Sequence, residues 1–393
     1  MSTALHILIL LVAIAPVLSC VYLGVLTLLS ARLPTPRPRP SNQDMVFDVL
    51  IPAHNESQVI VRTLSNLQKL DWPASNYRIL VIADNCTDDT AELSRQAGAH
   101  VLERQDATRR GKGYALEHAF AYSAQGPATA VVVVDADTEV TPNLLQACAA
   151  RIEQGALAVQ VNYGVLNPND SWRTRLITIA YGAFHAVRSR ARERMGVSCG
   201  LRGNGACYTH ALLRQHPFNI YSLTEDLEYG VLLGLNGIRV HYADEACADA
   251  EIIDSERGAR TQRSRWEGGR LAVARAYAGR LLGHAWRQRS ATSFELALDL
   301  LTLPLGNIVL QIVLLALVAG GAALIVPALA AWLWLPLILL LILAAHVWRG
   351  WQLAPVGWRA LADLAYVPFF ILWKMYAKLR TRGNKGWVRT DRK

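Results

Sequence analysis

The chain has 393 residues, enough for two domains of ordinary size, and carries a formal net charge of +9. Hydrophobic residues make up 52% of it, and residues 1–31 and 300–348 contain no Asp, Glu, Lys or Arg. This uneven distribution excludes a wholly water-soluble protein. It predicts a charged, soluble middle held by membrane segments on both sides.

The first apolar segment, Leu5–Leu29, has about the 20 residues that a membrane-spanning helix needs. A cleaved signal peptide would carry a basic N-terminal region, but no Lys or Arg precedes Arg32. We therefore expect an uncleaved helix within residues 1–31 and a stiff Pro/Arg-rich linker at 32–45. The positive-inside rule then places the N-terminus outside the cell and Arg32 inside.

Strand-like and helix-like segments alternate through residues 46–290, which predicts an α/β cytosolic domain with a doubly wound, mostly parallel sheet. The expected strands are 46–51, 77–83, 100–102, 131–137, 156–163 and 238–242. The expected helices include 57–70, 114–123, 171–195 and 227–235. Neither G-x-G-x-x-G nor G-x-x-x-x-G-K-[ST] occurs after a strand, which disfavours a dinucleotide-binding domain and a P-loop NTPase.

Four valines, Val131–Val134, predict a strand that is buried on both faces and ends at Asp135 and Asp137. Side chains two residues apart on a strand point the same way, so the two carboxylates are expected to form a fork. In open α/β sheets, ligands bind at the carboxyl ends of the strands. A pair of hard oxygen donors there suits Mg²⁺ or Mn²⁺ and, with it, a diphosphate. A simple polar turn is the alternative, because Asp also favours turns.

Further motifs surround this strand. Lys112 lies between two glycines in a short loop, where it could reach a phosphate or belong to a surface turn. The segment 200–207 is a glycine-rich turn, and 224–226 (TED) precedes an amphipathic helix, where acids are also favoured as ordinary N-terminal residues. Gln262-Arg263-Ser264-Arg265-Trp266 then opens a basic helix of the kind that lies on a membrane surface.

The apolar block within 295–350 is long enough for two more spans, with a hairpin near Gly320, Gly321 and Pro327. Three spans in all return the C-terminal tail to the inner side. Within 351–393, the stretch 364–373 is too short to span and predicts an interfacial or re-entrant helix. Because the basic residues flank the apolar segments, membrane lipid is the expected partner and nucleic acid is not.

The motifs taken together, with Asp84 in an acidic turn followed by DAD, TED and QRSRW, resemble glycosyltransferase family 2. Within that family, the chain looks like the membrane-integrated branch, which includes cellulose, hyaluronan and poly-N-acetylglucosamine synthases and ceramide-glucosyltransferase-like enzymes. The resemblance covers about residues 46–285. It implies a GT-A-like fold and an integral membrane protein, expected in a bacterial inner membrane with its catalytic domain in the cytosol.

The resemblance also implies roles for particular residues. The loop from Pro52 to Glu56 and the acid Asp84 would hold the nucleotide, Asp84 matching the acid that contacts a uracil ring. Asp135 and Asp137 would engage the nucleotide-sugar and the metal, with Asp137 as the more direct ligand. Asp226 would be the general base. The residues expected at the acceptor and the diphosphate are Gln262, Arg265, Trp266, Glu225 and Gly205.

These roles predict a metal-dependent, inverting sugar transfer, with the nucleotide-sugar, in the first place a UDP-sugar, as donor. A divalent ion would offset the charge on the leaving diphosphate, and a carboxylate on the opposite face would take the proton of the acceptor hydroxyl. The acceptor would be a lipid-linked sugar, a glycolipid precursor or a polysaccharide exported with partner proteins. A processive exopolysaccharide synthase is the nearest alternative. A catalytically idle scaffold subunit of an export complex is another, which the intact motifs disfavour.

Overall fold

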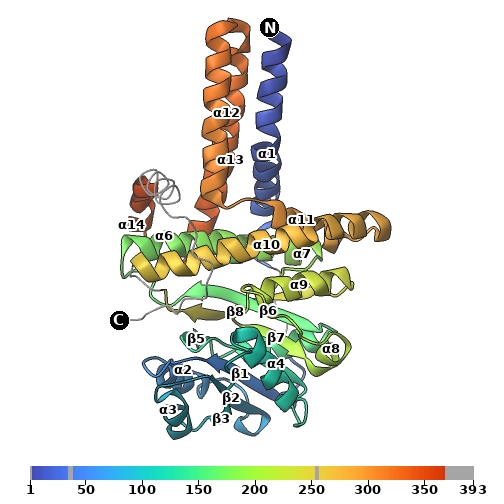
Figure 1. The fold of residues 1–393 in the computed structure, drawn as a ribbon, viewed down its shortest axis with the longest axis vertical. Helices are drawn as coiled ribbons and strands as arrows, with labels where there is room; N and C mark the ends of the chain where they lie inside the picture. The colour runs from blue at the N-terminus through green and yellow to red at the C-terminus, as the bar shows by residue number, and fades with distance from the viewer. Residues whose placement is uncertain (1, 34–38, 253–255, 368–393) are drawn as a thin grey trace.

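The computed structural model describes residues 2–33, 39–252 and 256–367, and within 256–265 it describes the backbone only. The molecule is elongated and has three levels along its long axis (Figure 1). A stalk of three long helices stands at one end, helices lie across its base, and an α/β domain forms the other end. The domain and the stalk therefore meet through the transverse helices.

The domain is built on one eight-stranded sheet with the strand order β3-β2-β1-β4-β7-β6-β8-β5. The strands are β1 (Phe47–Ala53), β2 (Tyr77–Asp84), β3 (His100–Arg104), β4 (Ala130–Val133), β5 (Thr138–Val140), β6 (Ala158–Val165), β7 (Ala206–Thr209) and β8 (Val240–Ala250). The half containing β1 to β4 is parallel, and β7 runs antiparallel to both β4 and β6. The α/β, GT-A-like fold is thus confirmed, with a mixed sheet in which four of seven pairings are parallel.

Helices cover both faces of the sheet because its central strands are apolar on both sides. In β1, Val49 and Ile51 join one hydrophobic cluster and Leu50 joins the other, as the alternation of side chains along a strand requires. The first cluster includes residues of α2 (Ile60–Leu67) and α5 (Leu144–Glu153), with α3 (Thr90–Gln96) beside them. The second includes residues of α4 (Lys112–Ser123), α8 (His210–Gln215) and α9 (Glu225–Leu235).

The predicted strand 131–137 is wrong at its end. Strand β4 stops at Val133, and the chain then turns, with the amide of Thr138 donating to the carbonyl of Asp135 (3.2 Å). Asp135 and Asp137 therefore lie in the turn between β4 and β5, where Asp is favoured. Strand alternation does not set the direction of these two side chains. Strand β8 is also longer than predicted and reaches Ala250.

The predicted helix 171–195 is interrupted by a π-helical segment. Its parts are α6 (Trp172–Tyr181), the π-helix η2 (Gly182–Val187) and α7 (Arg188–Met195). A stalk helix packs directly on η2, since a Cβ atom on Gly182 would lie 2.3 Å from the carbonyl oxygen of Gly350. Only glycine permits so close an approach of two backbones. A stalk helix is thus anchored at a π segment, a feature that is frequent at functional sites.

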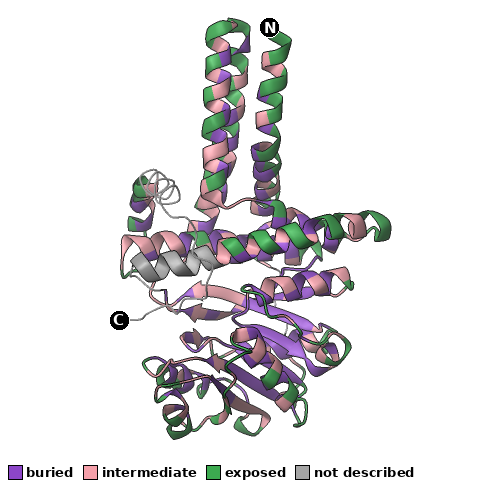
Figure 2. Cartoon of the chain, in the orientation of Figure 1, coloured by how far each residue is buried: buried purple, intermediate pink, exposed green. Residues whose placement is uncertain are grey.

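The stalk consists of α1 (Ser2–Leu29), α12 (Leu305–Ile325) and α13 (Trp334–Leu353), the last preceded by the 3-10 helix η3 (Pro327–Leu333). Within the described residues, three helices are long and apolar enough to cross a membrane. Their outward faces are exposed along the stalk, as Figure 2 shows, and carry large apolar side chains that suit lipid contact. The predicted hairpin is correct at Pro327, but Gly320 and Gly321 lie inside α12.

The transverse helices are α6, η2 and α7 together with α10 (Glu256–Gln288) and α11 (Ala291–Leu301), and they lie across the base of the stalk (Figure 1). Two short helices, α14 (Arg359–Ala362) and η4 (Asp363–Tyr366), follow the stalk, and η1 (Ala74–Asn76) precedes β2. Most of the predicted interfacial helix 364–373 lies outside the described residues, which end at 367.

Candidate active site

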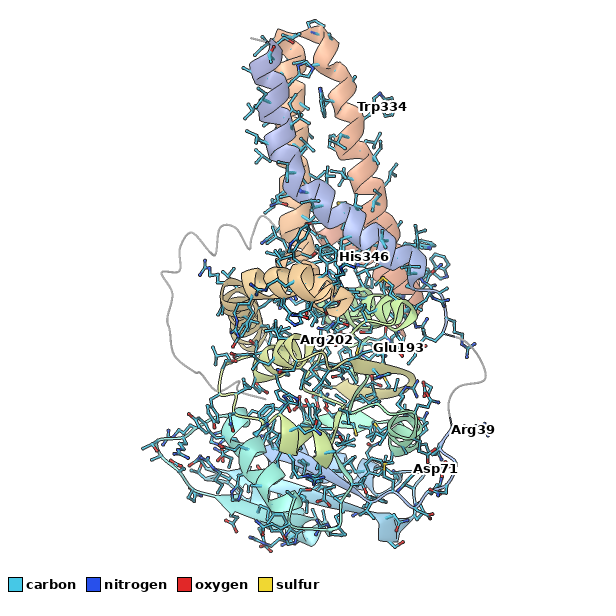
Figure 3. The ribbon with its side chains drawn as sticks, turned by 90° about the vertical axis from the view of Figure 1, so that its right-hand side faces the viewer. Arg39, Asp71, Glu193, Arg202, Trp334 and His346 are labelled. Carbon is cyan, nitrogen blue, oxygen red and sulfur yellow. The ribbon has the colours of Figure 1, made fainter. Side chains whose placement is uncertain are left out.

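A cavity of about 1060 Å³ runs from the strand ends of the domain to the base of the stalk. At one end it is lined by loops that follow β1, β2 and β4. At the other end it is lined by residues 302–305, which join α11 to α12, and by His346 of α13. Figure 3 shows the direction of this path, with Arg202 just below the transverse helices and His346 at the base of the stalk. The two ends differ in chemistry.

The loops after β1 and β2 form the far end of the cavity. Pro52, Glu56 and Asp84, all predicted to hold the nucleotide, line it. Asp84 is buried and forms an ion pair with Arg104, whose Nη1 lies 2.6 Å from its Oδ1. His54 Nδ1 lies 2.7 Å from the carbonyl oxygen of Asp84 and ties the two loops together. The tertiary structure thus brings these three predicted residues to one place.

Lys112 lies at the start of α4 and turns into the same cavity. Its Nζ donates to Asp135 Oδ1 (2.5 Å) and lies 4.0 Å from Glu225 Oε1. Although burial lowers the pKa of Lys112, the carboxylates of Asp135, Glu225 and Asp226 raise it above its ordinary value. The next residue, Gly113, has no room for a side chain, because a Cβ atom would lie 2.2 Å from the carbonyl oxygen of Ile220. The ammonium is therefore held among three acids.

The TED motif forms the first turn of α9, where the helix N-terminus favours acids. Burial raises the pKa of Glu225 to about 7, and the adjacent Asp226 adds to that rise. Burial also raises the pKa of Asp226, against the opposing positive charges of Lys112 and Arg202. A carboxyl group whose pKa is raised toward neutral pH is a better proton acceptor. The pair is thus suited to general-base chemistry.

The glycine-rich turn comes close to this acid. Gly203 has a φ of +76°, and a Cβ atom there would lie 3.0 Å from Asp226 Oδ2. Gly205, predicted beside the acceptor, does not line the cavity. It is buried in the sheet, where a Cβ atom would lie 2.4 Å from Val161 Cγ2. The turn therefore borders the site through Gly203.

The carboxylates of Asp135 and Asp137 fit a divalent ion by the chemistry of their donors. Both residues line the cavity, and hard oxygen ligands are the ones that Mg²⁺ and Mn²⁺ prefer. Lys112 already places a positive charge against Asp135. Within the described part of the chain, no three His, Cys, Asp or Glu side chains are grouped so as to hold an ion by themselves.

The opposite end of the cavity carries a group of arginines that sequence analysis did not assign to the site. The guanidinium carbons of Arg188, Arg202 and Arg270 lie 4.6, 4.5 and 5.6 Å from the centre of the Phe184 ring. All four residues line the cavity. They come from η2, α7, the turn before β7 and α10, which are far apart in sequence. The one available signal was Arg188, an arginine directly after an apolar helical run.

The remaining predicted residues belong to the QRSRW motif in α10. Trp266 lines the cavity, with its ring centre 6.5 Å from that of Tyr181. The side chains of Gln262 and Arg265 lie outside the described part of the structure. Helix α10 is held close to the TED motif, since a Cβ atom on Gly269 would lie 2.4 Å from Thr224 Cγ2. The helix that carries the motif therefore borders the site.

Comparison with known proteins extends this picture. The family described as "Glycosyltransferase like family 2" matches residues 44–269. The chain is 26% identical over 230 residues to an N-acetylglucosaminyltransferase of Rhizobium leguminosarum bv. viciae, covering 56% of this chain and 54% of the relative. It is 28% identical over 229 residues to a beta-monoglucosyldiacylglycerol synthase of a Nostoc species, covering 56% and 48%. The chain thus spans about half the length of these curated relatives.

Among solved structures, the chain resembles the mannosyltransferase PcManGT of Pyrobaculum calidifontis, whose structure is a complex with GDP-Man and Mn²⁺. The TM-score is 0.59 at 19% sequence identity, and the match covers 95% of this chain and 99% of the other. At this identity the likeness establishes the fold. It extends over the stalk as well as the domain.

Proposed function

The protein belongs to glycosyltransferase-like family 2, and we propose that it transfers a sugar from a nucleotide-sugar to an acceptor presented at a membrane surface. One observation carries this proposal. A single cavity joins the loops after β1 and β2, the acids Asp135 and Asp226, and the base of the three apolar helices. A water-soluble donor and a membrane-held acceptor can therefore meet in it.

In the proposed reaction the acceptor hydroxyl attacks the anomeric carbon of the donor sugar. Asp226 accepts the hydroxyl proton while the bond to the diphosphate breaks, and the nucleoside diphosphate leaves. Base and leaving group on opposite faces of the sugar invert the anomeric carbon. The ammonium of Lys112, which contacts Asp135, lies where it can also pair with a phosphate oxygen.

Asp135 and Asp137 are the residues that would hold Mg²⁺ or Mn²⁺. The ion would supply positive charge to offset the charge that develops on the leaving diphosphate. Without it, the positive charge that faces Asp135, Glu225 and Asp226 comes from Lys112, with Arg202 acting on Asp226 as well. A diphosphate added to this acidic end needs such compensation.

The proposed placement has the domain in the cytosol and the N-terminus outside, in a bacterial inner membrane, with transfer at the inner leaflet. It divides the chain into a helix (1–31), a linker (32–45), the transferase domain (46–290), two further spans (295–350) and a tail (351–393). Arg32 and the basic residues of the tail support this orientation by the positive-inside rule. Gln262, Arg265 and Trp266 would face the acceptor and the diphosphate.

Transfer of one sugar to a lipid is favoured over processive synthesis. The three described spans pack on one another through a continuous apolar cluster that includes Ile9, Leu23, Ile312 and Leu343. Such a closely packed group offers little room for a polymer path of its own. A polysaccharide product would therefore require partner proteins for export.

The direct test is release of nucleoside diphosphate by the purified full chain in lipid nanodiscs, with Mn²⁺ or Mg²⁺ and a panel of UDP- and GDP-sugars. We expect release with one donor, dependent on lipid, and a product identified by mass spectrometry as a lipid carrying one sugar. A ladder of products would favour the processive synthase. Absence of release with every donor, while nucleotide still binds, would favour the idle scaffold subunit.

A further inference from the structure

The arginines at the membrane end of the cavity exceed the acids that contact them. Asp299 Oδ1 lies 2.9 Å from Arg188 and 2.7 Å from Arg192, and Asp299 Oδ2 lies 3.7 Å from Arg270. Glu295 pairs with Arg192. Arg202 forms no salt bridge with any described carboxylate. The cluster thus sets four guanidinium groups, those of Arg188, Arg192, Arg202 and Arg270, against two carboxylates.

Buried polar atoms without a hydrogen-bond partner also line this cavity. Among the described residues they include His185 Nδ1, Arg188 Nε, Arg202 Nε, Thr224 Oγ1 and His346 Nε2. Each of these five residues lines the cavity. Arg188 is only 3% exposed and His346 is fully buried. Because buried polar groups in proteins are nearly always hydrogen-bonded, such a concentration indicates a wall built to bind a polar group.

The two arginine Nε–H groups can only donate hydrogen bonds, which defines the chemistry of the ligand. Donors with surplus positive charge suit an anion with several acceptor oxygens, and arginine is the preferred partner of phosphate. The guanidinium groups of Arg188, Arg202 and Arg270 all lie near the ring of Phe184, which attracts cations. The three guanidinium groups are thus gathered around one ring at this end of the cavity.

Apolar residues complete the membrane end. Leu303, Pro304 and Leu305 line the cavity where α11 passes into α12. Figure 3 shows the side chains of this region between Arg202 and the base of the stalk, where His346 lies. An anionic group with an attached apolar chain matches such a surface, whereas a free sugar does not.

We infer that the acceptor is an anionic lipid, whose headgroup phosphate is bound by Arg188, Arg202 and Arg270 and whose headgroup hydroxyl reaches Asp226. This inference rests on the proposed sugar transfer and names its acceptor class. The new bond joins the hydroxyl oxygen to the anomeric carbon, the bond from that carbon to the diphosphate breaks, and the proton passes to Asp226. The lipid phosphate is unchanged by the reaction.

The donor diphosphate is not the expected occupant of this wall. Lys112 and Asp135 lie at the other side of Asp226, next to the loops after β1 and β2. Arg202 borders Asp226 from the membrane side, since its charge acts on that carboxylate and its guanidinium stacks on Phe184. Two separate phosphate-binding regions therefore flank the base.

The test uses the full chain in neutral detergent micelles and isothermal calorimetry. The probes are dihexanoylphosphatidylglycerol, which has a phosphate and hydroxyls, dihexanoylglycerol, which has a hydroxyl alone, and inorganic phosphate. We expect the phospholipid to bind at least about tenfold more tightly than either of the others, the size expected for charge-assisted hydrogen bonds. Equal affinity for the neutral lipid would overturn the inference. So would inorganic phosphate binding as tightly as the phospholipid.

Variants locate the site. Arg202→Gln and Arg270→Gln should each weaken phospholipid binding about tenfold and leave UDP and GDP affinity unchanged. Arg275→Gln, on the exposed side of the same helix as Arg270, is the matched control and should bind like the wild type. Weaker nucleotide binding with unaltered lipid binding in the first two variants would assign the cluster to the donor and overturn the inference.

The outcomes separate this inference from the proposed function. Phospholipid binding that depends on charge, together with no transfer from any donor, would refute the enzyme and leave the lipid site in place. Transfer to a neutral lipid at full rate would support the enzyme and refute the anionic lipid as its acceptor. The melting temperature of each variant shows whether it is folded. The comparison of the three probes uses the wild-type protein and therefore stands even if a variant does not fold.

Discussion

The two ends of the cavity carry opposite charge. The end formed by the strand loops and α9 is rich in carboxylates, among them Asp84, Asp135, Asp137, Glu225 and Asp226. The membrane end presents the guanidinium groups of Arg188, Arg202 and Arg270 around one ring. An acidic end attracts a cation and a positively charged end attracts an anion. Under the proposed function, this contrast favours the metal-assisted donor at the first end and the acceptor at the second.

The two ends also differ in construction. The acidic end stands on the carboxyl ends of parallel strands, where neighbouring strands hold each loop. The basic end is assembled from helices that meet the stalk, including η2, on which α13 packs at Gly182 and Gly350. A shift of the stalk helices would therefore displace the residues of the basic end before those of the acidic end. The experiments below test this contrast, from the largest expected effect to the smallest.

Asp226→Asn should lower sugar transfer by about 10²–10⁴-fold, because the amide cannot accept the hydroxyl proton. Binding of nucleotide-sugar should persist, since the donor is held at the other side of the residue. Transfer is measured as nucleotide release, and donor affinity by calorimetry. Asp89→Asn, an exposed acid outside the cavity, is the matched control and should behave as wild type. If the Asp226→Asn variant transferred sugar at the wild-type rate, another residue would have to be the general base.

Asp299→Asn should destabilise the protein by ~3–5 kcal/mol, because it removes the carboxylate shared by Arg188, Arg192 and Arg270. Asp299 is 3% exposed, so water cannot replace the lost charge. The melting temperature of the protein in detergent measures the effect. Asp71→Asn, at an exposed position, provides the comparison. An unchanged melting temperature would show that the basic end does not depend on this acid.

Removal of divalent ions should lower transfer by about tenfold or more, and Mn²⁺ or Mg²⁺ should restore it. Asp137→Ala should raise the metal concentration needed for half-maximal transfer. Calorimetry with UDP and GDP, with and without the ion, gives a readout that is independent of turnover. Binding of the anionic lipid at the opposite end should not respond to the ion. A metal effect on lipid binding instead would contradict the division between the ends.

Transfer should rise with pH, because Asp226 acts as the base only when it is ionised and burial raises its pKa above its ordinary value. Glu225→Gln removes the neighbouring negative charge, so the pKa of Asp226 falls and the acid limb of the pH profile moves to lower pH. The pH dependence of nucleotide release measures this shift. A limb that stays in place would show that the two carboxyl groups titrate independently.

Sequence patterns revealed the acidic end because its chemistry is local. Asp135 with Asp137 and Glu225 with Asp226 are close pairs, and each stands beside a recognisable strand or helix. Even there, the predicted end of β4 was wrong. The preference of Asp135 for a turn outweighs the tendency of the valine run to continue as a strand. The family resemblance implied that Gly205 lies at the acceptor, yet it packs in the sheet while Gly203 faces Asp226.

The basic end shows no such pattern. Phe184, Arg202 and Arg270 share no motif, and three different segments must fold together before they meet. Arg188 was visible as an arginine after an apolar run, but nothing in the sequence indicates that it faces a cavity rather than solvent. Its partner Asp299 lies more than a hundred residues away.

The sequence by itself determined what depends on short-range physics. The length of apolar runs identifies helices that can span a membrane, alternation of strands and helices predicts an α/β sheet, and paired acids predict metal and base chemistry. Only the tertiary structure decided which segments that are far apart in sequence come into contact. It joined the loops after β1 and β2 to the stalk through one cavity and gathered guanidinium groups at the membrane end. These contacts are set by side-chain packing between folded elements, and motifs in the sequence do not show which surfaces will pack together.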